Sequence, residues 1–215
     1  MNEPLITFII PTQGTRDTLS RTLQSLLNQT DPEWLAIVVG DKTPDDFILP
    51  ISDSRISFLK LNEKKGCNGN YAGFVRNAGI DKVISPWIGF VDDDDSLTPD
   101  YVFIVKEQEL NTNLLIFKMK GGIHHTPIPA GNSKYDLTAA GVGISFAVRK
   151  EFIDKNNIRF IASEFEDWDF LYQCMHYNKK EEGINSLSGY FSDYSSWRSD
   201  LHLKILPNCC YNVKS

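Results

Sequence analysis

Two apolar runs separated by a helix-like segment dominate the first 40 residues. Leu5–Ile10 is a continuous, β-branched run ended by Pro11, and residues 34–39 form a second run of this kind. Such runs are typical of strands buried on both faces of a parallel sheet. Between them, four leucines from position 19 to position 27 recur at helical spacing. The pattern therefore predicts a strand–helix–strand unit.

The same alternation continues along the chain. Further strands are predicted at residues 56–61, 87–91, 114–119, 144–148, 184–187 and 203–206, and further helices at 68–83, 98–110, 152–156 and 166–177. Residues 121–143 lack a clear period and are predicted to form a long loop. Strands that alternate with helices predict an α/β fold with a mainly parallel central sheet.

Composition and charge exclude some classes of function. The 215 residues carry 28 acidic and 22 basic side chains, which gives a net charge of −6. This balance argues against a nucleic acid or an anionic membrane as the main partner. No window reaches the roughly 20 apolar residues of a membrane-spanning helix. Four cysteines without zinc or disulfide spacing, and no signal-like N-terminus, predict a cytoplasmic protein.

Acidic residues concentrate in two short segments. Asp92–Asp95 directly follow the predicted strand 87–91, and residues 164–169 hold four acids in six positions. Neighbouring carboxylates oppose each other's ionisation, and a divalent cation would offset that repulsion. The alternative is a solvated acidic turn that caps the next helix. Acids in the second segment also suit a helix N-terminus, and a carboxylate there that faced the metal would serve as a general base.

Five short motifs follow one another in a familiar order. They are Ile9-Ile10-Pro11-Thr12-Gln13-Gly14, Val38-Val39-Gly40-Asp41, Val75-Arg76-Asn77-Ala78-Gly79, Phe90-Val91-Asp92-Asp93-Asp94-Asp95 and Glu166-Asp167-Trp168-Asp169. Together they resemble the inverting family 2 glycosyltransferases of the GT-A fold, of the short type found in bacteria and large DNA viruses. The resemblance implies a single Rossmann-like α/β domain with a mixed, mainly parallel sheet flanked by helices. It also implies a nucleotide-sugar half at 1–95, ending in a DxD motif, and an acceptor half at 96–215 with a flexible C-terminal loop.

The resemblance assigns a role to each motif residue. The donor-binding residues are Pro11, Thr12 and Gln13 around the nucleoside, Asp41 on the uracil, Arg76 near the nucleotide, Asp92 and Asp93 in the DxD segment, and Asp95 near the sugar. Asp94 binds Mn²⁺ or Mg²⁺ at the diphosphate, with His202 or Asp200 as a further ligand, although Asp93 and Asp95 satisfy the same DxD spacing. Asp167 is the general base, and Glu166 positions it.

The implied reaction is metal-assisted transfer of a hexose or deoxyhexose from a nucleotide sugar, a UDP-sugar above all, to a hydroxyl of a glycan or glycoconjugate. Residues 190–200 resemble a lid over the acceptor, or else form an exposed aromatic tail. Two other functions stay open. One is a nucleotidyltransferase, to whose glycine-rich basic loop Pro11–Arg16 is a poor match, and the other is a non-catalytic sugar-binding domain. The chain is either a complete domain in the cytoplasm, of a host if viral, or one domain of a longer protein.

Overall fold

The computed structural model describes residues 3–66, 71–108, 110–121, 124–134, 137–139, 141–176, 199 and 201–213. The strand predicted at 184–187, Asp200 and nearly all of the segment 190–200 lie outside these residues. Among the described residues, no helix combines the length and the apolar character needed to cross a bilayer.

The described strands form one sheet in the order β3-β2-β1-β4-β8-β6-β9-β5, with β7 paired to β6. The strands are β1 (Ile6–Thr12), β2 (Trp34–Asp41), β3 (Ile56–Leu61), β4 (Trp87–Phe90), β5 (Ser96–Leu97), β6 (Leu114–Gly121), β7 (His124–Ile128), β8 (Phe146–Arg149) and β9 (Leu203–Val213). The helices are α1 (Leu19–Leu27), α2 (Gly73–Ile80), α3 (Tyr101–Glu107), α4 (Lys150–Lys155) and α5 (Glu166–Met175).

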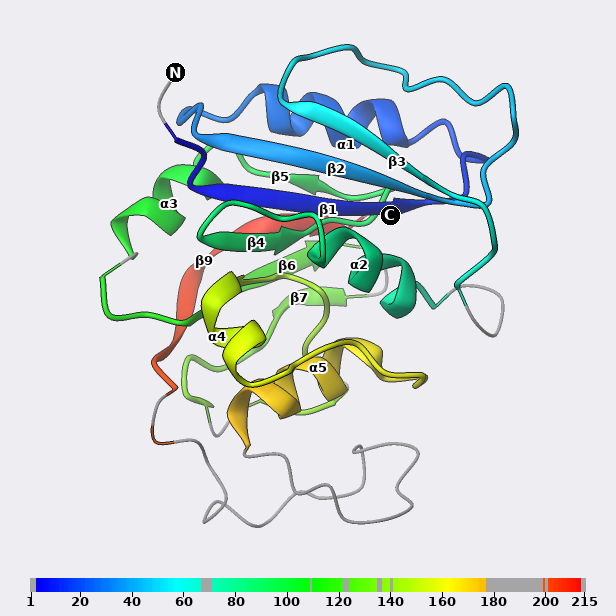
Figure 1. Ribbon diagram of the computed structural model, residues 1–215. Helices are drawn as coiled ribbons and strands as arrows, with labels where there is room; N and C mark the ends of the chain where they lie inside the picture. The colour runs from blue at the N-terminus through cyan, green and yellow to red at the C-terminus, as the bar shows by residue number, and fades with distance from the viewer. Residues whose placement is uncertain are drawn as a thin grey trace.

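The sheet is mixed and mainly parallel, as predicted. Strands β3, β2, β1 and β4 pair in parallel, and β6 and β9 also pair in parallel. Strand β8 is antiparallel to both β4 and β6, so β6 and β9 run in the same direction as β4. Figure 1 shows β1, β2 and β4 ending at the same side of the molecule. The loops after these three strands therefore meet.

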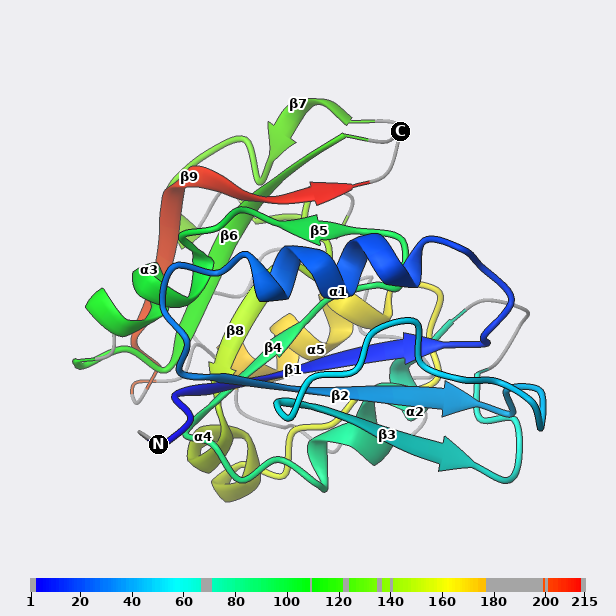
Figure 2. The ribbon, with the colours of Figure 1, turned by 90° about the horizontal axis from the view of Figure 1, so that it is seen from above.

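Helices cover both faces of the sheet. Figure 2 shows α1 on one face and α2, α4 and α5 on the other. Successive residues of β1 point to opposite faces of the sheet. The ring centroid of Phe8 lies 5.5 Å from that of Tyr101 in α3, whereas Ile9 packs against Gly79 of α2. A Cβ atom at Gly79 would lie 2.7 Å from Ile9, so glycine allows α2 to approach the strand this closely. Burial on both faces explains the continuous apolar run.

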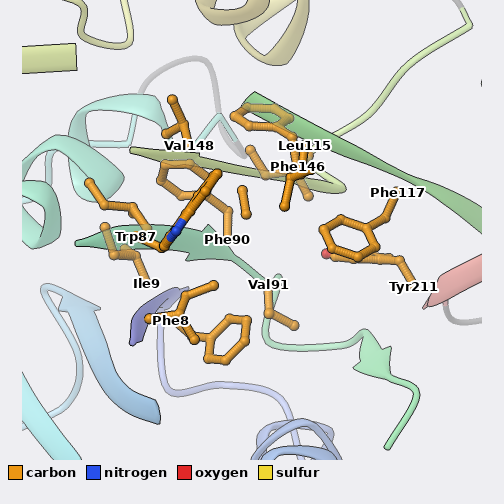
Figure 3. Packing of buried hydrophobic residues seen from close by; sticks show 14 of the residues in the cluster. Phe8, Ile9, Trp87, Phe90, Val91, Leu115, Phe117, Phe146, Val148 and Tyr211 are labelled. Carbon is orange, nitrogen blue, oxygen red and sulfur yellow. The ribbon is translucent and has the colours of Figure 1, made fainter. Parts of the chain in front are cut away.

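An aromatic cluster supports the end of β4. The ring centroid of Phe90 lies 5.3 Å from that of Phe146, 5.4 Å from Phe160 and 5.8 Å from Phe170. All four rings are buried, and Figure 3 shows Phe90 beside Phe146. Edge-to-face contacts at such distances stabilise a core beyond simple burial. Because Asp92 follows Phe90 by two positions, this cluster fixes the point at which the acidic segment leaves the sheet.

Strand β1 continues past the expected stop at Pro11 and ends at Thr12. The carbonyl of Ile9 accepts a hydrogen bond from the N–H of Val91, which shows that this side of β1 faces β4. Pro11 lies two positions later and faces the same side, beyond the last residue of β4. Since no β4 residue pairs with Pro11, the missing N–H of proline breaks no ladder hydrogen bond. This extension brings Thr12 to the edge of the sheet.

Other elements also differ from the sequence prediction. The expected loop 121–143 contains β7, which pairs with β6, and β9 extends to Val213 instead of ending at residue 206. Helix α2 begins at Gly73, later than predicted. The pairing of β6 with β9 includes register shifts between Ile116 and Met119. A bulged strand interrupts the regular alternation on which sequence prediction depends, which explains why β9 is predicted too short.

Candidate active site

A cavity of about 370 Å³ opens where β1, β2 and β4 end. Its walls include eight of the predicted site residues, namely Pro11, Thr12, Gln13, Asp41, Arg76, Asp92, Asp93 and Asp94. Tyr71, Ala72 and Val75, in and just before α2, also line the cavity, as do Thr15, Arg16 and Gly66. Ligands of open α/β sheets bind outside the carboxyl ends of the strands, and this cavity occupies that place.

Asp41, the last residue of β2, is buried and anchors a loop. Its Oδ1 accepts the backbone N–H of Lys65 at 2.6 Å, and its Oδ2 accepts that of Gly66 at 3.0 Å. These bonds draw the segment that follows β3 against the cavity. A carboxylate has about four acceptor positions, so Asp41 retains capacity for a further donor on the cavity side. The structure thus places Asp41 at the cavity and gives it a structural task as well.

Arg76 of α2 joins the acidic segment to α5. Its Nη2 donates to Asp92 Oδ1 at 2.6 Å, its Nη1 donates to Glu166 Oε1, and Nη1 lies 3.8 Å from Asp167 Oδ1. The side chain of Arg76 is only 4% exposed. Burial alone would lower the pKa of Arg76, but the carboxylates of Asp92, Asp167 and Glu166 outweigh burial and raise it. The guanidinium therefore stays charged at the centre of three carboxylates.

Glu166 also binds the start of α2. Its Oε1 accepts the backbone N–H of Ala72 at 3.1 Å, and its Oε2 accepts that of Gly73 at 2.6 Å. A carboxylate at this position satisfies amides that have no partner inside the helix and interacts favourably with the helix dipole. A Cβ atom at Gly73 would lie 2.7 Å from Glu166 Oε2, so only glycine permits this approach. Glu166 thereby fixes both α2 and Arg76, and with them the position of Asp167.

The carboxyl group of Asp167 has a strongly raised pKa. Burial raises the pKa of Asp167 to about 7; Arg76 opposes this rise, whereas Asp92 and Glu166 add to it. Its Oδ1 is inaccessible and has no hydrogen-bond partner among the described residues, yet 29% of the side chain is exposed. A carboxyl with these properties can exchange a proton near neutral pH, and a general base requires that ability.

Asp93 and Asp94 turn to the other side of the cavity. Asp93 is buried; its Oδ2 accepts the hydroxyl of Thr12 at 2.6 Å, and its Oδ1 accepts Arg16 Nη1 at 3.2 Å. Burial raises the pKa of Asp93, although Thr12 and Arg16 oppose that rise. Asp94 Oδ2 accepts Arg16 Nη1 at 2.7 Å, and Arg21 donates to the Asp94 carbonyl oxygen. Arginines therefore offset the repulsion within the acidic segment.

Asp95 and His202 lie elsewhere. Asp95 is buried and absent from the cavity wall, and its carbonyl oxygen accepts the hydroxyl of Thr22 at 2.7 Å. His202 is exposed, and its carbonyl oxygen accepts the N–H of Leu114, at the start of β6. The acidic segment follows the opposite end of the parallel strand β4. Neither Asp95 nor His202 is among the residues that line the cavity beside Asp94.

Two contributors carry no sequence signal of their own. Tyr211 of β9 is buried, and its Oη accepts the backbone N–H of Asp92 at 3.2 Å. Burial, with the carboxylates of Asp92 and Asp95, raises the pKa of Tyr211 well above its usual range. Arg16 lies in the segment between β1 and α1. A single tyrosine in a C-terminal strand and a single arginine in a loop follow no pattern, so neither could be selected from the sequence.

The carboxylates at the cavity suit a divalent cation that is coordinated by both carboxylate and phosphate oxygens. Among the described residues, no three His, Cys, Asp or Glu side chains gather as a metal cluster. Asp92 and Asp94 are 37% and 28% exposed, and an arginine occupies one oxygen of each. Mg²⁺ and Mn²⁺ commonly use one or two carboxylates and complete their shell with substrate phosphates and water. Asp94, with Asp92, is the pair that suits this mode of binding.

Several curated proteins of glycan biosynthesis are similar in sequence to parts of this chain. The succinoglycan biosynthesis protein ExoO of Rhizobium meliloti is 31% identical over 45% of this chain and 27% of its own length. The Escherichia coli UDP-Glc:alpha-D-GlcNAc-diphosphoundecaprenol beta-1,3-glucosyltransferase WfgD is 28% identical over 54% of this chain and 43% of its own length. The Staphylococcus aureus poly(ribitol-phosphate) beta-N-acetylglucosaminyltransferase TarP is 27% identical over 93% and 66%, respectively. The chain thus spans less than half the length of ExoO and WfgD.

Solved structures and a family model also match this chain. S. aureus TarS 1-349 in complex with UDP-GlcNAc superposes with a TM-score of 0.66 at 18% identity, over 98% of this chain and 58% of that one. The mannosyltransferase PcManGT of Pyrobaculum calidifontis, in complex with GDP-Man and Mn²⁺, gives 0.64 at 10% identity, over 100% and 57%. These likenesses show the fold. Residues 7–107, just under half of the chain, match the model of glycosyl transferase family 2, so this part of the chain is similar to that family.

Proposed function

We propose that this chain is the donor-binding and catalytic part of an inverting glycosyltransferase, which moves a hexose or deoxyhexose from a UDP-sugar to a hydroxyl of a glycan or glycoconjugate. The observation that carries the proposal is the Arg76 cluster, which joins Asp92 at the cavity to Glu166 and Asp167 of α5. In this proposal, the cavity that would hold an anionic nucleotide lies next to a carboxyl, Asp167, whose pKa is raised to about 7. The UDP-Glc in the name of WfgD and the UDP-GlcNAc bound in the TarS complex support a UDP-sugar donor.

Donor binding would use both halves of the cavity wall. Pro11, Thr12 and Gln13 line one side, and Asp41 has acceptor capacity for a base N–H. The Arg16 guanidinium lies on the same wall and can offset phosphate charge. Because the same wall carries four aspartates, a divalent cation would supply the rest of the positive charge that a diphosphate needs in a chain with a net charge of −6. In this proposal residues 1–95 bind the donor and residues 96–215 supply the base and the acceptor side.

Asp167 would act as the general base. The acceptor oxygen attacks the anomeric carbon while the bond from that carbon to the diphosphate oxygen breaks, and the hydroxyl proton moves to Asp167. Glu166 and Arg76 would position Asp167 without taking the proton, because Arg76 retains its charge and Glu166 is held by three donors. A divalent cation bound by Asp94 and Asp92 would neutralise the negative charge on the departing nucleotide. Attack and departure on opposite sides of the carbon invert its configuration.

A binding screen followed by a transfer assay tests the proposal. Thermal unfolding would be recorded with UDP-, GDP- and TDP-sugars in the presence of Mn²⁺, and we expect a UDP-sugar to raise the Tm most. Asp167→Asn should keep that shift and lose transfer by about 100-fold or more, since general bases contribute on that scale. Glu164→Gln is the matched control, because it removes a charge from the same segment at an exposed position. Absence of any nucleotide-dependent shift, or full transfer by Asp167→Asn, would refute the proposal.

A further inference from the structure

Arg16 holds the two aspartates that offer alternative metal positions. Its Nη1 lies 2.7 Å from Asp94 Oδ2 and 3.2 Å from Asp93 Oδ1, so one nitrogen bridges both carboxylates. Asp93 has a second donor, the buried hydroxyl of Thr12, whereas the carboxylate of Asp94 is more exposed. Arg21 binds the backbone of Asp94 and leaves its carboxylate to Arg16. Arg16 is therefore the described cation that neutralises the Asp94 side chain.

The setting of Arg16 makes this contact exchangeable. Its side chain is 49% exposed, and it lies between the end of β1 and the start of α1, in a stretch without regular secondary structure. Ion pairs at such exposure contribute little, because water competes for both partners. The Arg16 side chain also lines the cavity, so its guanidinium can reach Asp94 or a ligand inside the cavity without unfolding an element.

A divalent cation and Arg16 compete for one carboxylate. Two positive centres that share Asp94 repel each other, so the arrangement that favours the cation is the one in which the guanidinium has left. A nucleotide diphosphate in the cavity offers the released guanidinium a stronger, charge-assisted partner. When Arg16 occupies Asp94, a smaller fraction of the molecules can bind a cation. The apparent affinity for the cation is the intrinsic affinity multiplied by that fraction.

We propose that Arg16 is an internal counter-ion of Asp94, which a divalent cation displaces and which then binds the diphosphate of the donor. Arg16 is thus a positioning residue that couples cation binding to donor binding. The inference rests on the proposed function for the identity of the donor. The competition between Arg16 and the cation needs no nucleotide and can be measured separately.

The first test is a titration of the whole chain with Mn²⁺ alone. Calorimetry, or the paramagnetic signal of free Mn²⁺, records the binding. Arg16→Gln should bind Mn²⁺ about threefold more tightly than the unaltered chain, as expected when a weak competitor is removed. Arg16→Lys should lie between the two. Arg21→Gln is the matched control, because it removes an equal charge beside Asp94 without freeing its carboxylate, and its affinity should change less than that of Arg16→Gln.

The second test is a titration with UDP at saturating Mn²⁺. Here Arg16→Gln should bind roughly tenfold more weakly, because the released guanidinium can no longer contact the diphosphate. The opposite signs of the two effects distinguish exchange from general damage to the site, which would weaken both. Equal or weaker Mn²⁺ binding by Arg16→Gln would overturn the inference. Tighter Mn²⁺ binding in a chain that no nucleotide stabilises would instead support the competition and refute the proposed donor.

Discussion

Arg76 and Arg16 bind neighbouring aspartates of one segment, but the first is buried and the second is exposed. The side chain of Arg76 is 4% exposed and contacts Asp92 and Glu166, whereas that of Arg16 is 49% exposed and contacts Asp93 and Asp94. The same chemical pair therefore appears twice within one cavity wall, in different dielectric surroundings. The comparison predicts that burial, and not the choice of residues, separates a fixed contact from an exchangeable one.

The physical basis is the cost of leaving a charge alone. Removing one partner of a buried ion pair leaves the other charge without water or a counter-ion, and stability falls steeply. At the surface, water replaces a lost partner and the change is small. Glu166 also accepts two backbone amides of α2, so the buried cluster supports a helix and a strand end together. Among the described residues, the ion pairs of Arg16 are with the acidic segment alone.

The largest expected effect is on the buried side. Arg76→Met should lower the free energy of unfolding by about 3–5 kcal/mol, because Glu166 would remain buried without its guanidinium. Urea-induced unfolding measures this change, with Arg16→Gln as the matched control of equal charge. If the two variants lost the same free energy, the distinction between the two clusters would be wrong.

The next effect concerns Asp94, on the exposed side. Asp94→Ala should weaken UDP binding in the presence of Mn²⁺ by about tenfold or more, because the cation would lose a carboxylate ligand. Without Mn²⁺, the same substitution should change UDP affinity much less, since it frees Arg16 for the phosphates. Calorimetry with and without Mn²⁺ compares the two conditions. Equal losses in both would contradict the role of Asp94 as a cation ligand.

A smaller, pH-dependent effect should arise from Asp167. The pKa of Asp167 is raised from 3.8 to about 7, so between these values the folded chain holds a proton that the unfolded chain has released. The contribution of this group to stability is therefore present below pH 4 and is lost as pH rises toward 7. Asp167→Asn should reduce this decline, which unfolding at pH 4.5 and pH 8 would reveal. The transfer rate should show the reverse trend and rise through about pH 7, because the base must be ionised.

The smallest effect is on the stability contribution of Arg16. Arg16→Gln should change the free energy of unfolding by less than about 1 kcal/mol, and 1 M salt should reduce even that difference. Unfolding measured at low and high salt tests this expectation. A loss comparable to that of Arg76→Met would show that the pair with Asp94 is not exchangeable.

Much of the site was predictable because parallel strands end at one edge. Thr12, Asp41 and Asp92 come at the ends of three apolar runs, and the structure places all three at the cavity. The contact between Arg76 and Glu166 joins residues 90 positions apart, and neither the sequence pattern nor the family resemblance predicted it. Asp95 was predicted at the sugar; it is buried and is not among the residues that line the cavity. Adjacent carboxylates look alike in sequence, and only the path of the backbone distinguishes them.

The sequence by itself determined the α/β class, the buried strands and the place where charged loops gather, because hydrophobic periodicity is a local property and strands that alternate with helices form a mainly parallel sheet. Only the tertiary structure decided which charges meet. It paired Arg76 with Asp92 and Glu166, gave Arg16 to Asp93 and Asp94, and left His202 at the far end of β6. Coulomb energy depends on distance and on burial, and neither quantity follows from position along the chain. For this reason the sequence predicted a cation to balance the four aspartates, whereas the fold also supplies arginines to do so.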